Sequence, residues 1–160
     1  MMNMLDGALL LATEHKFRVL PVKPPAWGGP SIGKVPLIKD WVRLATTNAD
    51  QIEKWWSQWP DANIGIATGK ESGIFVLDVD VATGGLESAQ QLFRQSAWPK
   101  VPIVRTGSGG LHFYFGYDGS FPLRNSASEL APGLDVRCEG GYVVAPPSLH
   151  ASGTRYEWTN

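Results

Sequence analysis

Residues 73–80, which read Gly-Ile-Phe-Val-Leu-Asp-Val-Asp, constrain the fold more than any other stretch of this chain. A nearly continuous apolar run with β-favouring residues lies between a glycine and a Thr-Gly-Gly turn, and this pattern is typical of a buried strand. Side chains alternate between the two faces of a strand. The sequence therefore predicts that Asp78 and Asp80 project from the same face.

Two carboxylates this close repel each other unless a cation lies between them. Hard oxygen ligands at this spacing suit Mg²⁺ or Mn²⁺, which take the rest of their coordination shell from water and substrate phosphates. The alternative is that the strand has ended and that Asp78 and Asp80 are solvated turn residues. Later parts of the chain favour the metal interpretation.

Composition indicates one globular domain covering residues 1–160, with 43% hydrophobic and 18% charged residues. The net charge of −1 does not indicate a polyanionic partner. It does not exclude one, because local patches of positive charge matter more for binding than the total charge. Cys138 is the only cysteine, so an internal disulfide and a cysteine-based zinc site are both excluded.

The two ends of the chain bear on its context. The N-terminus contains Asp6 and no long apolar run, so we expect neither a signal peptide nor a membrane span, and we expect a cytoplasmic protein. Residues 155–160 have a strand-like pattern without a tail. This predicts a domain that forms the N-terminal part of a longer protein.

The order of elements predicts an α+β domain, because strands and helices mix without strict alternation. Asn3 is expected to cap the first helix and Thr47 the second. A loop rich in proline and glycine, residues 23–40, carries lysines that either meet phosphates or are simply solvated. Helices are expected at 4–15, after Thr47 up to Pro60, and at 86–97; strands at 17–22, 63–69, 73–80, 102–106, 112–115, 133–137 and 141–145; a polar connection at 120–132; and the loop lysines are Lys23, Lys34 and Lys39.

A tryptophan cluster lies on the second predicted helix, at Trp55, Trp56 and Trp59. Aromatic side chains of this kind can stack on nucleic-acid bases. Tryptophans at helical spacing more often belong to a core or a domain contact, and we favour that interpretation.

Three later features strengthen the case for a functional site. Residues 105–110, Arg-Thr-Gly-Ser-Gly-Gly, form a turn whose small residues let backbone N–H groups approach an anion, although a plain hairpin turn looks similar. His112 is a polar residue that opens an apolar strand. Asp135 lies inside a strand-like stretch, where an unpaired acid is costly.

In this order, the motifs resemble the catalytic pattern of the archaeo-eukaryotic primase superfamily, and specifically the bifunctional DNA primase/polymerase (prim-pol) N-terminal domain. The resemblance covers about residues 8–158. Each motif is weak alone, but their shared order is specific. The motifs lie at residues 59–65, 76–80, 105–112, 133–137 and 140–148.

The resemblance implies a role for each matching residue. Asp78, Asp80 and Asp135 would bind the catalytic Mg²⁺ or Mn²⁺ ions in a two-metal site, and no zinc is expected. His112 would contact the phosphates of the incoming nucleotide. Arg137 would either neutralise phosphate charge or brace Asp135. Further phosphate contacts are expected from the glycine-rich loop, at Arg105, Ser108, Gly109 and Gly110.

The resemblance also implies a fold and an activity. The fold would place an N-terminal α/β unit against a unit related to the RNA-recognition motif, with the active site in the cleft between them. The activity would be DNA primase or DNA polymerase chemistry, acting on a single-stranded DNA template, a primer and (d)NTPs. The family context is plasmid, phage or prophage replication, with a helicase domain or protein as a partner.

Two other functions remain open. A non-catalytic primase-like module would grip DNA or nucleotide for a replicative helicase. A glycosyltransferase would use Asp78 and Asp80 to hold a nucleotide sugar through Mn²⁺, but it would give no role to Asp135 or His112. A purely structural domain would leave the acids and the glycine-rich loop as coincidence.

Overall fold

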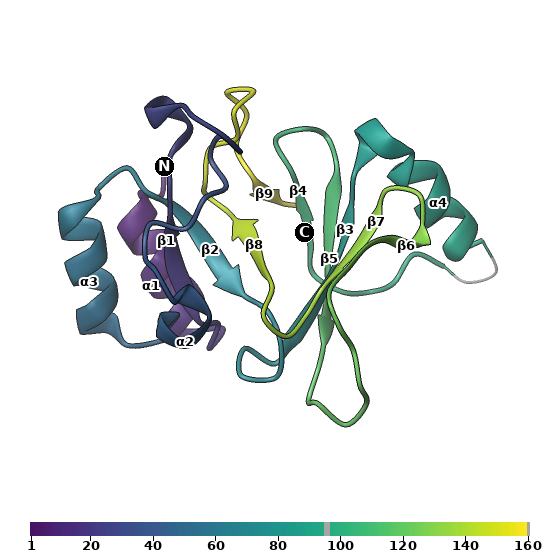
Figure 1. The fold of residues 1–160 in the computed structure, drawn as a ribbon, viewed down its shortest axis with the longest axis horizontal. Coiled ribbons are helices and arrows are strands. Elements are labelled where there is room, and N and C mark those ends of the chain that lie inside the picture. Colours follow the sequence, from purple (N-terminus) through teal and green to yellow (C-terminus); the bar gives the residue numbers. More distant parts are fainter. Residues whose placement is uncertain (95–96, 160) are drawn as a thin grey trace.

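The chain folds into two antiparallel β-sheets that face each other, with helices on the outer side of each sheet (Figure 1). The computed structural model describes residues 1–94 and 97–159. The smaller sheet has the strand order β1-β2-β8, and the larger sheet has the order β6-β7-β3-β5-β4-β9. The predicted α+β class is confirmed.

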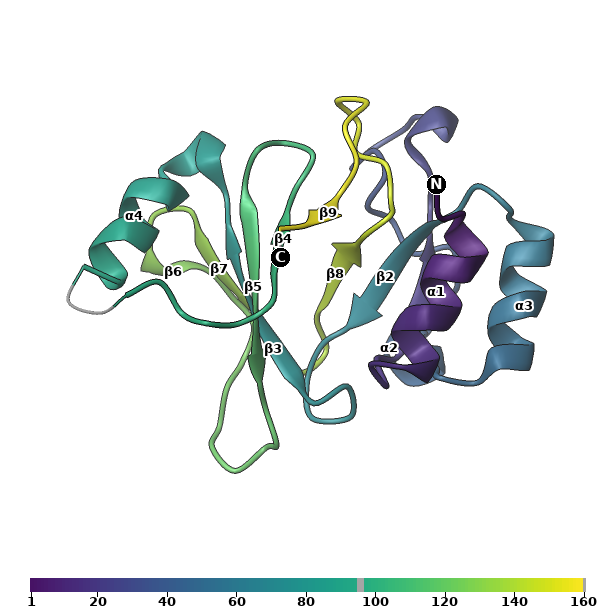
Figure 2. The same ribbon diagram turned by 180° about the vertical axis from the view of Figure 1, so that it is seen from behind.

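The smaller sheet is built mainly from the N-terminal part of the chain, and it takes β8 from the C-terminal part. As predicted, the first helix begins after Asn3, whose side chain accepts a hydrogen bond from the N–H of Asp6. Helices α1 and α3 cover the outer face of this sheet (Figure 2). The elements are α1 (Met4–Thr13), β1 (Val19–Val22), η1 (Pro25–Trp27), α2 (Trp41–Leu44), α3 (Ala49–Gln58), β2 (Asn63–Ala67) and β8 (Tyr142–Ala145).

The prediction that Thr47 caps the second helix is wrong by one residue. Asn48 caps α3, and its Oδ1 accepts a hydrogen bond from the N–H of Gln51 at 2.9 Å. The core interpretation of the tryptophans is confirmed, because Trp55 and Trp56 are 8% and 2% exposed and the partly buried Trp59 packs against the same core. Trp55 and Trp56 pack in the core between α3 and the smaller sheet.

The larger sheet separates two environments, because side chains alternate along its strands. Leu77 and Val79 point from β3 toward α4 (Gly85–Leu92), where Phe113 and Leu134 join them in a small core. The opposite face looks toward the smaller sheet. The strands are β3 (Ile74–Val79), β4 (Ile103–Arg105), β5 (Leu111–Gly116), β6 (Ser126–Ala131), β7 (Leu134–Arg137) and β9 (Glu157–Trp158).

Two element predictions need correction. Part of the predicted polar connection at 120–132 is strand β6, which pairs with β7 at the end of the strand order of the larger sheet. The predicted helix at 86–97 ends at Leu92 as α4, and its residues 95 and 96 lie outside the described residues. None of the helices in the described part of the chain has the length and apolar character needed to cross a membrane.

The chain passes between the sheets repeatedly. It leaves the smaller sheet after β2, returns with β8, and leaves again for β9. One large core joins the sheets, because Val76, Val104 and Tyr114 of the larger sheet pack in the same cluster as Ile64 and Ile66 of the smaller one. The two sheets therefore form one folded unit.

Candidate active site

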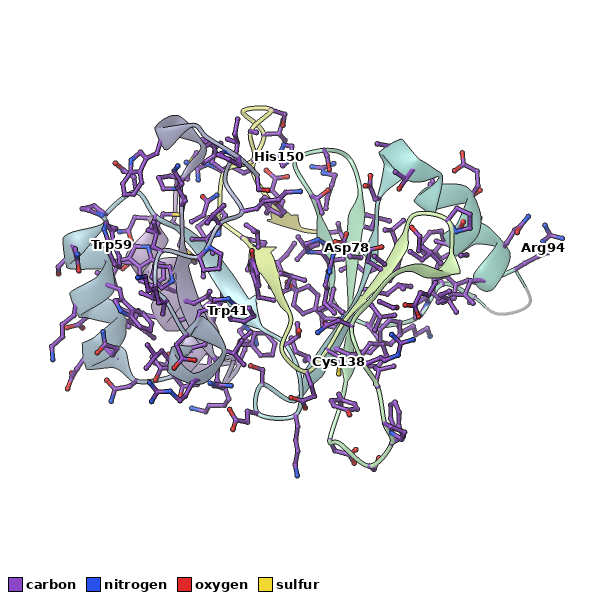
Figure 3. All side chains as sticks on the ribbon, viewed as in Figure 1. Trp41, Trp59, Asp78, Arg94, Cys138 and His150 are labelled. Carbon is purple, nitrogen blue, oxygen red and sulfur yellow. The ribbon has the colours of Figure 1, made fainter. Side chains whose placement is uncertain are left out.

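Three polar side chains lie side by side on three neighbouring strands of the larger sheet. Asp78 on β3 is paired directly with His112 on β5 and with Asp135 on β7. Residues directly opposite each other in antiparallel strands share a face of the sheet. Here that face is the one turned away from α4, so all three side chains lie on the side of the smaller sheet. Figure 3 shows Asp78 at this position.

Asp80 reaches the same place from just beyond the end of β3. Its backbone is still extended, and its Oδ1 accepts a hydrogen bond from the N–H of Ala82 at 2.9 Å, which begins the short helix η2 (Val81–Thr83). The alternation of the extended chain therefore puts Asp78 and Asp80 on one cavity of about 260 Å³. The predicted site residues around this cavity are Asp78, Asp80, Ser108, His112, Asp135 and Arg137.

His112 is a buried residue of the site, and it lies beside Asp78. Nε2 of His112 lies 3.4 Å from Oδ1 of Asp78, and the two side chains are 6% and 28% exposed. Burial pushes the pKa of Asp78 upward, but the hydrogen bond and charge of His112, together with Arg137 and Lys34, outweigh it and hold this pKa below its ordinary value. Asp78 is therefore ionised at neutral pH.

The other ring nitrogen of His112 lacks a hydrogen-bond partner in the part of the chain that the structure describes. Nδ1 is buried and forms no hydrogen bond within the described residues. Buried polar atoms are nearly always paired, so an unpaired one calls for an explanation. His112 itself lines the cavity, and its other ring nitrogen, Nε2, faces Asp78 there.

Asp135 is held by two donors of its own. Nη2 of Arg137 lies 2.8 Å from its Oδ2, and the N–H of Ser128 donates to its Oδ1 at 3.0 Å. Arg137 thus braces Asp135 while also lining the cavity, so the two roles considered for it are compatible.

The three carboxylates have the chemistry of a site for a hard cation, since all are oxygen donors around one polar cavity. In the described part of the chain, no three acidic, histidine or cysteine side chains converge closely enough to hold a metal ion. Asp80 and Asp135 each accept a hydrogen bond from a nearby backbone N–H, of Ala82 and Ser128 respectively. The donor set fits Mg²⁺ or Mn²⁺, and closing it around a cation requires these side chains to reorient.

The glycine-rich loop contributes less than its sequence suggests. Arg105 lies on the opposite face of the larger sheet, where its Nη2 pairs with Oε2 of Glu157 at 2.7 Å. The N–H groups of Gly109 and Gly110 bond to Thr106 within the turn. Only Ser108 of the predicted loop residues lines the cavity.

Gly110 has a steric reason to be glycine. A Cβ at this position would lie 2.3 Å from the carbonyl oxygen of Val79, which is far inside contact distance. The loop therefore packs directly against the end of the strand that carries Asp78.

Five further residues line the cavity that sequence reasoning did not place in the site: Lys34, Val79, Thr106, His150 and Tyr156. Lys34 stood out only as one of three loop lysines. His150 and Tyr156 follow the last predicted motif, where nothing in the local sequence marks a ligand contact. Burial and the nearby Lys34 lower the pKa of His150.

Comparison with protein families gives a match over most of the chain. The model of the family described as bifunctional DNA primase/polymerase, N-terminal, matches residues 8–160. No curated protein matches the chain.

Proposed function

Because this chain belongs to the bifunctional DNA primase/polymerase N-terminal family, we propose that it catalyses template-directed nucleotidyl transfer. The observation that carries this proposal is the meeting of Asp78, Asp80, Asp135 and the buried His112 around one cavity. An Asp-x-Asp glycosyltransferase would need only the first two of these residues.

In the proposed reaction, the 3′-hydroxyl of a primer attacks the α-phosphorus of a nucleoside triphosphate, and pyrophosphate leaves. Asp78, Asp80 and Asp135 would hold Mg²⁺ or Mn²⁺. When bound, such cations lower the pKa of the attacking hydroxyl and neutralise charge on the leaving oxygens.

The protein's own groups would position the nucleotide. Arg137 lines the cavity with a planar guanidinium that suits phosphate oxygens. His112 would contact the nucleotide phosphates from beside Asp78, whose Oδ1 lies 3.4 Å from its Nε2. The lowered pKa of Asp78 keeps its carboxylate charged, as a cation ligand must be.

The remaining parts of the proposal concern partners and context. A primase/polymerase domain binds DNA and nucleotides, and we propose single-stranded DNA as the template. Because the net charge of the chain is −1, affinity for the template should come from local contacts to the phosphate backbone of the DNA. This affinity should weaken as the salt concentration rises. We also propose that residues 1–160 form one catalytic domain, which works with a helicase in plasmid, phage or prophage replication.

Labelled nucleotide incorporation on single-stranded DNA, with and without a primer and with Mg²⁺ or Mn²⁺, tests the activity. Asp78→Asn and Asp135→Asn are expected to lower incorporation by at least about 100-fold, because each removes charge from the reaction centre. Asp118→Asn is the control, since Asp118 lies on an exposed loop outside the cavity. Incorporation that survives both site variants would contradict the proposal.

A non-catalytic binding module is the second candidate. The observation that favours it is that the carboxylates do not converge into a metal site in the described residues. Binding of nucleotide or DNA without incorporation under any divalent metal would support this module instead.

A further inference from the structure

A second cavity continues from the first toward the smaller sheet. It has a volume of about 360 Å³, and it shares Asp78, His112 and Arg137 with the first cavity. At its other end it is lined by Trp41 and Tyr142. Asp78 and Trp41 therefore line the same cavity from well-separated positions, Asp78 on the larger sheet and Trp41 beside the smaller one (Figure 3).

Lys34 lines both cavities, and its backbone is firmly held. Its carbonyl oxygen accepts a hydrogen bond from the hydroxyl of Tyr142 on β8. The carbonyl of the preceding Gly33 accepts one from Nδ2 of Asn63, a fully buried residue on β2, at 3.2 Å. The smaller sheet thus fixes the base of this side chain beside the site.

Within the described residues, the ammonium group of Lys34 has no carboxylate partner. Ion pairs within residues 1–94 and 97–159 include Arg137 with Asp135, but none includes Lys34. Its positive charge lies beside the site, because Lys34 lines the same cavity as Asp78 and Asp135. An unpaired cation beside a cavity of carboxylates is suited to an anionic ligand that binds together with cations.

The far end of the second cavity is aromatic. Trp41, the first residue of α2, meets Tyr142 edge to face, with ring centroids 4.8 Å apart. Asn125 also lines this end, but its Oδ1 accepts from the N–H of Cys138 and its Nδ2 donates to the carbonyl of Glu139. This end therefore offers aromatic surface and no free side-chain amide to read a base.

We propose that residues 34–41 grip the incoming nucleoside triphosphate across the two cavities, with Lys34 on its phosphates and Trp41 against its base. This inference rests on the proposed function and adds an orientation to it. The phosphates lie toward Asp78 and Asp135, and the base lies toward the smaller sheet. Because base–aromatic stacking is tolerant of sequence, such a pocket accepts every base and leaves the choice to the template.

Calorimetric binding of dGTP, dGMP and deoxyguanosine, in the presence of Ca²⁺, tests this orientation without any need for turnover. Lys34→Ala is expected to weaken dGTP binding by about 10-fold and to leave deoxyguanosine unchanged, because a charge-assisted contact to phosphate is lost. Lys34→Arg keeps the charge and is expected to restore most of the affinity. Lys39→Ala is the matched control from the same loop, since Lys39 lines neither cavity.

Trp41→Leu is expected to weaken all three ligands by a similar factor of about 10, because stacking does not depend on the number of phosphates. Trp41→Phe keeps an aromatic face and is expected to retain most of the affinity, which separates stacking from a loss of packing. A Lys34→Ala variant with an unchanged preference for dGTP over deoxyguanosine would overturn the inference while leaving the proposed function intact. Failure of the wild-type protein to bind any of the three ligands would instead count against the proposed function.

Discussion

His150 shows how a single residue reports on the site around it. Its Nδ1 accepts a hydrogen bond from the N–H of Ser152 at 3.0 Å, which favours the neutral ring with its proton on Nε2. Burial and the charge of Lys34 act in the same direction and lower its pKa from 6.5. Lys34 and His150 are far apart in the sequence, so this coupling exists only in the folded chain.

We expect His150 to titrate below 6.5 in an NMR pH titration of the native protein. Between that native value and 6.5 the unfolded chain binds more protons, so stability falls as the pH drops through this window. In Lys34→Ala the pKa should move toward 6.5, while burial still holds it lower. Lys39→Ala should leave it unchanged, and a wild-type pKa at or above 6.5 would contradict the geometry.

At this scale the sequence allowed some site residues to be predicted and hid others. Asp78 and Asp80 could be predicted because strand alternation alone puts them on one face. Asp135 and His112 followed from the order of the motifs. Lys34 could not be placed, because its position depends on contacts to β2 and β8 that no local pattern encodes. Arg105 was expected beside the phosphates, but its place in β4 turns it toward Glu157.

At the scale of elements, the apolar strands were predicted from the sequence, whereas the polar edge strand β6 was missed. β6 is largely exposed and lacks the alternation that marks a half-buried strand. It nevertheless positions the site, because the N–H of its Ser128 donates to Asp135. β6 is recognised as a strand only by its pairing with β7, and this pairing is set by the tertiary structure and not by the local sequence.

Helix α3 offers a direct test of an element boundary. Asn48→Ala is expected to lower the free energy of unfolding by about 1 kcal/mol, because the side-chain cap on the N–H of Gln51 is lost. Thr47→Ala is the matched control and should change it little, since Thr47 makes no such hydrogen bond in the described structure. Urea unfolding followed by tryptophan fluorescence measures both. Equal losses for the two variants would mean that the cap is misassigned.

At the scale of the whole molecule, the two sheets are bound together by the path of the chain and by a shared core. β8 lies in the smaller sheet, yet the strands before and after it, β7 and β9, belong to the larger one. Side chains from both sheets pack in one cluster. Neither sheet can leave the other without exposing that core.

We therefore expect one cooperative unfolding transition. Native-state hydrogen exchange should give similar opening free energies for the central amides of β2 and β3, although they lie in different sheets. Fluorescence of the buried Trp55 and Trp56 and far-ultraviolet circular dichroism should give the same urea midpoint. Earlier exchange throughout one sheet would show instead that the sheets unfold as separate units.

The pairing of β3 with its neighbours also bears on how such a domain can change during evolution. Asp78 faces the cavity while Leu77 and Val79 face the core beneath α4. Deleting a single residue within β3 would exchange these faces, burying carboxylates under the helix and turning leucine and valine into the site. Point substitutions around the cavity do not change which face of β3 each side chain occupies. Lineages of this domain should therefore vary freely in loop length but keep the residue count of this strand unchanged.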